Sequence, residues 1–166
     1  MRETVGTAIA RSLIAGALSG LRSASGPTLA AWQLRGERTR RRDRLPRRLL
    51  ASEHALEATS ALAAGEVLAD KHPAMPNRTD PPALLGRAVA GALAASALAG
   101  RRASLQTVVG HALLGAGAAV VGAYLGYYAR RAATEHSGAP NALIAMAEDA
   151  LTYAGGALAL RGVSRR

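Results

Sequence analysis

Two carboxylates, Glu66 and Asp70, stand one helical turn apart near the end of a long run of alanine and leucine. Side chains three or four positions apart share one face of a helix, so both point the same way. Lys71 follows directly, and Pro73 ends the predicted helix because proline cannot continue its hydrogen-bonding pattern. Charges at the end of such an apolar helix need partners or contact with solvent.

Other apolar runs also contain charges. Arg22 lies in the first run, Arg87 lies near the start of the third, and Glu148 and Asp149 lie near the middle of the last. A charge at the centre of a bilayer costs about 3 kcal/mol or more, so it is retained with a partner or for a purpose. Two interpretations of Glu148 and Asp149 stay open: a cation or proton site, and a structural ion pair with Arg22. For Glu66 the alternative is a solvated helix end.

The composition allows either a membrane protein or a nucleic-acid-binding protein. The chain has 166 residues, which indicates a single domain, residues 1–166. Its net charge is +10 and its pI near 11.4, and every basic residue except Lys71 is arginine. The mean hydropathy is only +0.09, but the charges are concentrated between apolar runs. Aromatic residues make up 3% of the chain, so bases would find few rings to stack on, and we expect no nucleic-acid partner.

No motif of a known catalytic site is present. The absence of cysteine excludes disulfides, thiolate metal sites and a thiol nucleophile. The four histidines lack metal-ligand spacing, and His111, in the apolar fourth run, is typical of a hydrogen-bonded packing residue. There is no phosphate-binding loop and no HExxH motif. We therefore expect no enzyme activity, no metal and no cofactor.

Five apolar runs alternate with polar segments. The first, Ser12 to Leu34, is long enough to cross a bilayer, because about 20 residues span ~30 Å of hydrocarbon. Gly26 and Pro27 predict a break or kink within it. A cleaved signal peptide ending near Ser23-Ala24-Ser25 is the alternative. The other runs are Leu49 to Asp70, Ala83 to Gly100 (the weakest), Thr107 to Tyr128 and Asn141 to Leu160.

The segment Arg35 to Arg48 carries eight arginines against Glu37 and Asp43. Loops rich in arginine remain on the cytoplasmic side of a membrane and are attracted to anionic headgroups. We therefore expect this segment to be a cytoplasmic loop beside the lipid bilayer. With five spans, the amino terminus would lie outside the inner membrane and the carboxyl terminus inside. An arm that binds nucleic acid is the alternative.

The first and fourth runs resemble each other: shifted by 100 residues, Thr7 to Gly16 lies over Thr107 to Ala116. If this similarity is a repeat, each unit has two helices, a linker helix joins the units, and the second unit is inverted. Inverted repeats around a site near the midplane are typical of transporters.

Glycines four positions apart occur in both of these runs, as Gly16 with Gly20 and Gly122 with Gly126. Such small residues allow two helices to approach closely. They predict that the two runs cross, either within one protomer or across the interface of a homodimer.

Three motifs in a fixed order carry a family resemblance: Gly20-Leu21-Arg22-Ser23, Glu66 to Pro73, and Pro140 to Asp149. Together with Gly86-Arg87, they resemble the uncharacterised bacterial membrane proteins of domain-of-unknown-function family 4126 over nearly the whole chain. The chain departs from the pattern by its long Arg35 to Arg48 loop and by its lack of phenylalanine. The resemblance implies a small multi-helix inner-membrane protein and assigns no reaction.

We therefore expect an all-α, polytopic membrane bundle of four or five transmembrane helices, with an inverted two-helix repeat joined by a linker helix. The leading functional hypothesis is a small ion- or proton-coupled transporter or channel for an unidentified substrate. One alternative is a non-transporting membrane scaffold or partner subunit, in which the charges only fix helix register. The other is a soluble, basic, helical nucleic-acid-binding protein. In the first hypothesis the site comprises Arg22, Glu66, Asp70, Lys71, Arg87, Glu148 and Asp149.

Overall fold

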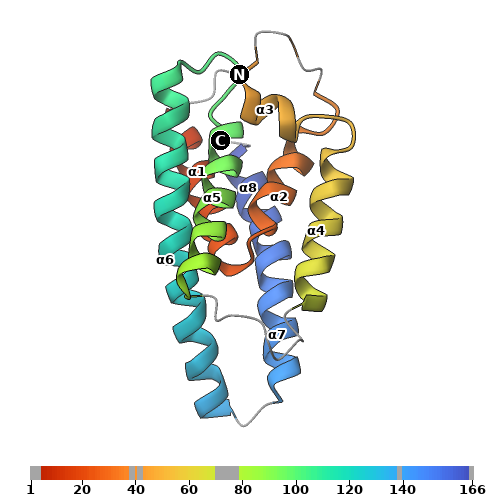
Figure 1. Ribbon diagram of the computed structural model, residues 1–166, viewed down its shortest axis with the longest axis vertical. Helices are drawn as coiled ribbons and strands as arrows, with labels where there is room; N and C mark the ends of the chain where they lie inside the picture. Colours follow the sequence, from red (N-terminus) through yellow and green to blue (C-terminus); the bar gives the residue numbers. More distant parts are fainter. Residues whose placement is uncertain (1–4, 38–39, 41–42, 70–78, 138–139, 165–166) are drawn as a thin grey trace.

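All regular structure in the computed structural model is helical over the residues that it describes: 5–37, 40, 43–69, 79–137 and 140–164. The predicted all-α class is confirmed. Asp70, Lys71 and Pro73 lie outside the described residues. The helices, shown in Figure 1, are α1 (Val5–Leu21), α2 (Ser25–Leu34), α3 (Leu45–Leu50), α4 (Ala55–Ala69), α5 (Pro81–Ala97), α6 (Leu105–Ser137), α7 (Asn141–Ala150), the π-helix η1 (Leu151–Gly155) and α8 (Gly156–Ser164).

Helices α1 and α2 form an antiparallel hairpin rather than one broken span. The chain turns at Arg22-Ser23-Ala24, before the predicted break at Gly26 and Pro27. Pro27 fits within the first turn of α2, where its missing N–H costs no helical hydrogen bond. Gly26 serves close packing instead, because a Cβ there would clash with the Ser19 hydroxyl and the Ala15 carbonyl. The first apolar run therefore enters the bundle and returns.

Two further boundaries differ from the sequence-based prediction. Pro46 lies in the first turn of α3, so the end of the arginine-rich segment is helical rather than loop. The chain then turns again at Ala51–His54, and α4 begins only at Ala55. At the other boundary, α6 continues through Arg130 to Ser137, because the alanine-rich sequence favours helix and Arg131 pairs with Glu135 one turn later at 2.8 Å.

The core lies between α1, α5 and α6, which are packed through small side chains. Ala15, Ala94 and Ala119 are fully buried. A Cβ on Gly16 would clash with the Gly115 carbonyl of α6, and one on Gly20 would clash with the Ala119 carbonyl. A Cβ on Gly122 would clash in turn with Ala17 of α1; Gly126 is also buried. The predicted close approach of these helices occurs within one protomer.

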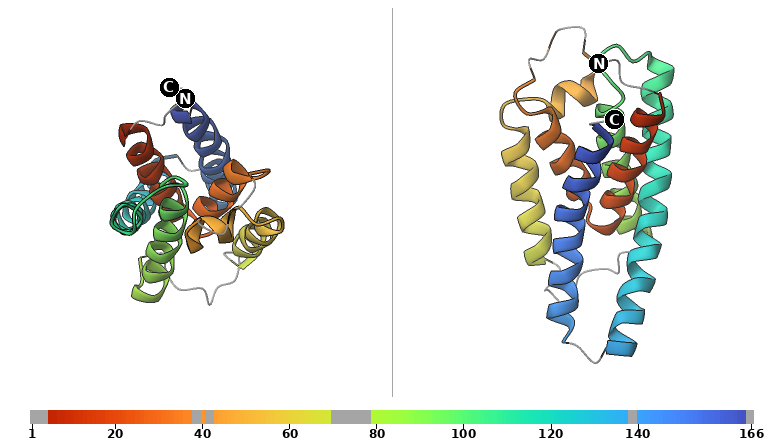
Figure 2. Two further views of the ribbon diagram at one scale, coloured as in Figure 1. Left: turned by 90° about the horizontal axis from the view of Figure 1, so that it is seen from above. Right: turned by 180° about the vertical axis from the view of Figure 1, so that it is seen from behind.

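Helices α1 and α6 run in parallel, so this pair is not inverted as predicted. Ser12 contacts His111, and Gly16 and Gly20 lie beside Gly115 and Ala119, so the positions advance together along both helices. The reason is the α1–α2 hairpin, because it reverses the direction of the chain once more between α1 and α6 than the sequence predicts. The start of α1 and the end of α8 consequently lie at the same end of the molecule as α3, rather than at opposite ends (Figures 1 and 2).

Two helices are long and apolar enough to cross a membrane by length and composition, although the buried core helix of a soluble protein can meet the same test. They are Leu105–His136, with mean hydropathy 1.7, and Leu143–Arg161, with mean hydropathy 1.3. The 33 residues of α6 measure about 50 Å at 1.5 Å per residue, and α7, η1 and α8 form a second rod beside it (Figure 2). Large apolar side chains are exposed along most of the helices, among them Leu62, Leu85, Leu113, Leu125, Met146 and Leu158.

Candidate functional site

The turn between α1 and α2 lies inside the bundle, where its backbone polar groups need partners from the protein. The last carbonyls of α1 and the first N–H groups of α2 have no partners within their own helices. Part of the requirement is met locally, because the Ser25 hydroxyl lies 2.7 Å from the carbonyl oxygens of both Leu18 and Arg22. The remainder is met by charged side chains from other helices.

Glu66, on α4, caps the amino-terminal end of α2. Its Oε1 accepts a hydrogen bond from the Ser23 N–H at 2.9 Å, and its Oε2 accepts one from the Ala24 N–H at 3.0 Å. The positive end of a helix dipole favours a carboxylate at this position. The Glu66 side chain is 13% exposed, so these two hydrogen bonds are protected from solvent.

Arg87, on α5, caps the carboxyl-terminal end of α1. Its Nη1 donates to the Gly20 carbonyl at 3.0 Å and to the Leu21 carbonyl at 2.9 Å. Its Nη2 lies 3.8 Å from Glu66 Oε1, so the two caps also form an ion pair. Each charge of this pair therefore stabilises the end of the helix whose partial charge is opposite to its own.

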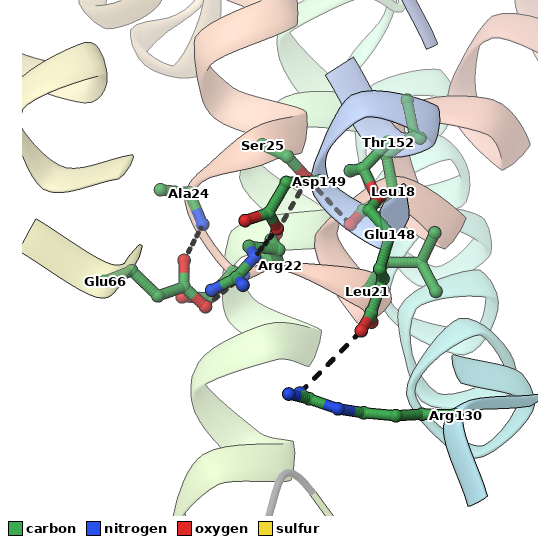
Figure 3. Close-up of polar contacts among 12 residues, drawn as sticks. Leu18, Leu21, Arg22, Ala24, Ser25, Glu66, Arg130, Glu148, Asp149 and Thr152 are labelled. Carbon is green, nitrogen blue, oxygen red and sulfur yellow. Dashed lines mark hydrogen bonds and ion pairs between the residues drawn. The ribbon is translucent and has the colours of Figure 1, made fainter. Parts of the chain in front are cut away.

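Arg22, in the turn itself, is 3% exposed, and its Nε donates to Asp149 Oδ1 of α7 (Figure 3). Of the two adjacent carboxylates, Asp149 is thus the one that faces Arg22. Glu148 points toward α6, where its Oε2 lies 3.8 Å from Arg130 Nη1, because neighbouring positions on a helix differ by about 100° in direction.

We call these six residues the charged centre: Arg22, Glu66, Arg87, Arg130, Glu148 and Asp149. Figure 3 shows how Glu66 approaches the turn from one side and Asp149 from another, with Arg130 reaching Glu148. The turn lies partway along the bundle, and α6 and α7 extend beyond it (Figure 1). Among the described residues, the centre contains three arginines and three carboxylates, and its formal charge is balanced.

The chain matches the family model for the domain of unknown function DUF4126 over residues 9–161. The chain belongs to this family. The resemblance seen in the sequence is therefore confirmed, and the matched region of this DUF4126 protein includes the whole charged centre. No similar curated protein and no similar solved structure was found.

Four residues in or near the charged centre of this DUF4126 protein were not predicted from the sequence as participants. Arg130 follows the fourth apolar run, which ends at Tyr128, so the hydropathy pattern predicts a loop there. Tyr153 lies in η1, close enough to interact electrostatically with Glu66, Arg22 and Asp149. The buried Tyr153 hydroxyl has no hydrogen-bond partner in the described part of the chain. The backbone N–H groups of Ser23 and Ala24 carry no signal in the sequence, since their role arises only from the turn.

His111 lies outside the charged centre and behaves as a packing residue. It is buried, and its Nδ1 lies 2.5 Å from the Ser12 hydroxyl, across the contact between α1 and α6. Among the described residues no group of His, Cys, Asp or Glu is arranged to hold a metal ion.

Proposed function

We propose that this protein is a small integral membrane protein of the bacterial inner membrane that moves protons or small cations through its charged centre. The observation that carries the proposal is the buried turn between α1 and α2. Non-helical backbone at membrane depth occurs where protein or a water-filled cavity surrounds it. Ionisable residues at that depth are typical of ion and proton pathways. Large apolar side chains, such as Leu113 and Leu158, meanwhile face outward, where lipid would contact them.

The π-helical turn η1 supports this role. It follows directly after Glu148 and Asp149 and carries Tyr153. Single π-helical turns within α-helices frequently occur at functional sites. The buried Tyr153 hydroxyl, which lacks a hydrogen-bond partner among the described residues, suits a water molecule or an ion in transit.

The balanced charge of the centre limits how transport would proceed. While Arg22 forms its ion pair with Asp149, the negative charge of the carboxylate is already neutralised and does not attract a further cation. A proton or cation must therefore take the place of Arg22 at the Asp149 carboxylate. In this proposal, protonation of Asp149 weakens its attachment to the turn and couples the position of α7 to the proton.

A non-transporting membrane scaffold is the second candidate, and the completeness of the pairing favours it. Glu66 and Arg87 cap the two helix ends at the turn, and Arg22, Asp149 and Glu148 each have a partner of opposite charge. Such pairs can fix the register of helices without any transport.

In either case we propose that the end of the bundle that carries α3 faces the cytoplasm, with anionic headgroups near the segment Arg35 to Arg48. The start of α1 and the end of α8 lie at this same end and would also face the cytoplasm.

Proteoliposomes distinguish the two candidates. The purified protein is reconstituted with an interior pH dye, and a potassium gradient with valinomycin provides the driving potential. Transport predicts proton or cation flux above that of protein-free vesicles, and loss of this flux in Asp149→Asn. The matched control is Glu135→Gln, which removes an exposed carboxylate paired with Arg131 and should leave the flux unchanged. A wild-type flux equal to that of protein-free vesicles would reject transport and leave the scaffold.

A further inference from the structure

We propose that this protein binds a phosphate group in a cavity at the α3 end of the bundle, lined by Arg40, Asp43, Arg101 and Arg102. The cavity has a volume of ≈ 410 Å³. It is separate from the charged centre: Arg87 lies near the start of α5, whereas Arg101 follows the end of that helix.

Two connections that are distant in the sequence form this cavity. Gly100 adopts a φ of +103°, a left-handed conformation that favours glycine, and so turns the chain between α5 and α6. Arg101 and Arg102 follow at once. From the α2–α3 connection, Asp43 Oδ2 accepts a hydrogen bond from the Arg40 N–H at 2.7 Å and lies 3.5 Å from Arg101 Nη2. Asp43 thus joins the two connections.

The carboxylates near the cavity, Glu37 and Asp43, neutralise only part of the positive charge of the arginines there. Arg101 reaches both Asp43 and Glu37, and Glu37 also binds Arg47 at 2.5 Å. Among the described residues, no ion pair involves the side chain of Arg40 or Arg102. The cluster of charged residues here comprises the arginines Arg40, Arg47, Arg101 and Arg102 and the carboxylates Glu37 and Asp43. Two positive charges therefore remain that the described residues do not neutralise.

Asp43 remains ionised and keeps the cavity organised. The hydrogen bond from the Arg40 backbone lowers the pKa of Asp43; burial opposes this effect, and the Arg101 guanidinium adds to it. The fixed carboxylate thereby holds Arg101 at the wall of the cavity.

Phosphate is the anion that best matches this arrangement. The planar guanidinium presents paired N–H donors that fit phosphate oxygens in a bidentate manner. A phosphate monoester carries a charge of about −1.5 to −2 at pH 7, which matches the two uncompensated arginines. The source is either the headgroup of an anionic lipid or a soluble phosphate. The lipid source rests on the proposed membrane location, whereas the soluble source does not.

Thermal unfolding of the full-length protein tests this site with two probes. Inorganic phosphate is titrated into the protein in phosphate-free detergent solution. In a second measurement, phosphatidylcholine nanodiscs that contain phosphatidic acid are compared with nanodiscs that lack it. In the variant Arg40→Gln/Arg102→Gln, the probe concentration that gives a half-maximal rise in unfolding temperature should increase by roughly tenfold or more. Such a loss of affinity is expected when charge-assisted hydrogen bonds are removed. The matched control Arg44→Gln/Arg48→Gln removes the same charge from exposed arginines at the same end.

A response to phosphatidic acid alone identifies a lipid headgroup site, and a response to inorganic phosphate identifies a site for soluble phosphate. The proposal is overturned if neither probe raises the unfolding temperature, or if the control pair weakens the response as much as the cavity pair. Absence of flux in proteoliposomes would leave this result unaffected, so the two proposals fail independently.

Discussion

Arg22 and Asp149 lie 127 positions apart in the sequence and meet in an ion pair inside the helix bundle. This pair attaches the turn between α1 and α2 to α7. Glu66 and Arg87 attach the same turn to α4 and α5 through its backbone. One short turn therefore connects α1 and α2 to three further helices, α4, α5 and α7, at the polar interior of the molecule.

Glu66→Ala should destabilise the protein more than Glu66→Gln. Alanine leaves the buried N–H groups of Ser23 and Ala24 without acceptors, and each such group costs about 1–3 kcal/mol. Glutamine keeps one acceptor oxygen and loses the charge. Denaturant unfolding in detergent micelles measures both, with the exposed Glu57→Ala of the same helix as the control. Equal stability of all three variants would show that Glu66 does not cap α2.

Glycine-to-alanine substitutions in α6 should have opposite effects according to position. Gly122→Ala would force its methyl group into the Ala17 carbonyl, so separation of α1 and α6 and a loss of about 1–3 kcal/mol are expected. Gly117→Ala meets open space and should stabilise the helix by about 0.5–1 kcal/mol. Unfolding of the two variants under the same conditions checks the difference. A similar effect of both would contradict the close contact between α1 and α6.

Single cysteines at Gly6 and Gly36 should be labelled from the same side of the membrane, because α1 and α2 form a hairpin that returns to one end. The chain has no cysteine of its own, so no background labelling is expected. The measurement is reaction with an impermeant maleimide in intact and inverted vesicles. Labelling of the two positions from opposite sides would contradict the hairpin and support the single broken span predicted from the sequence. Retention of the protein in the membrane after alkaline carbonate washing tests the membrane location itself.

Asp43 should make stability at the α3 end depend on acid pH. The pKa of Asp43 in the folded protein is lower than its ordinary value of 3.8, mainly because of the hydrogen bond from the Arg40 backbone. A lowered pKa contributes stability that is present above the ordinary value and is lost as the pH falls through the folded-state value. The free energy of unfolding of the wild type should therefore fall below pH 3.8 more steeply than that of Asp43→Asn. Parallel pH profiles would exclude this role.

The partners of the charged centre could be predicted in part, because charges in apolar runs must find opposite charges. Arg22 was predictable as the partner of one of two adjacent carboxylates, and the structure shows that Asp149 is the one. The choice between Glu148 and Asp149 was not predictable, since it depends on the rotation of α7 about its axis.

The topology could not be predicted, because two local signals were ambiguous. Pro27 breaks a helix in its interior but is equally compatible with a first turn, and it has the second role here. The similarity of the first and fourth runs indicated a repeat. In the structure those two helices pack against each other in parallel, so similar small residues at matching positions reflect a shared contact face.

The measurement that tests the central claim most directly is a double-mutant cycle between Arg22 and Asp149. Arg22→Gln, Asp149→Asn and the double variant are unfolded in the same micelles as the wild type. Asp149→Asn removes this carboxylate from the buried Arg22 and should cost about 3 kcal/mol or more. Arg22→Gln leaves Asp149, which is 23% exposed, and should cost less. The double variant should cost clearly less than the sum, with a coupling of about 1–3 kcal/mol. Additive losses, or no loss at all, would show that this ion pair does not organise the centre of the protein.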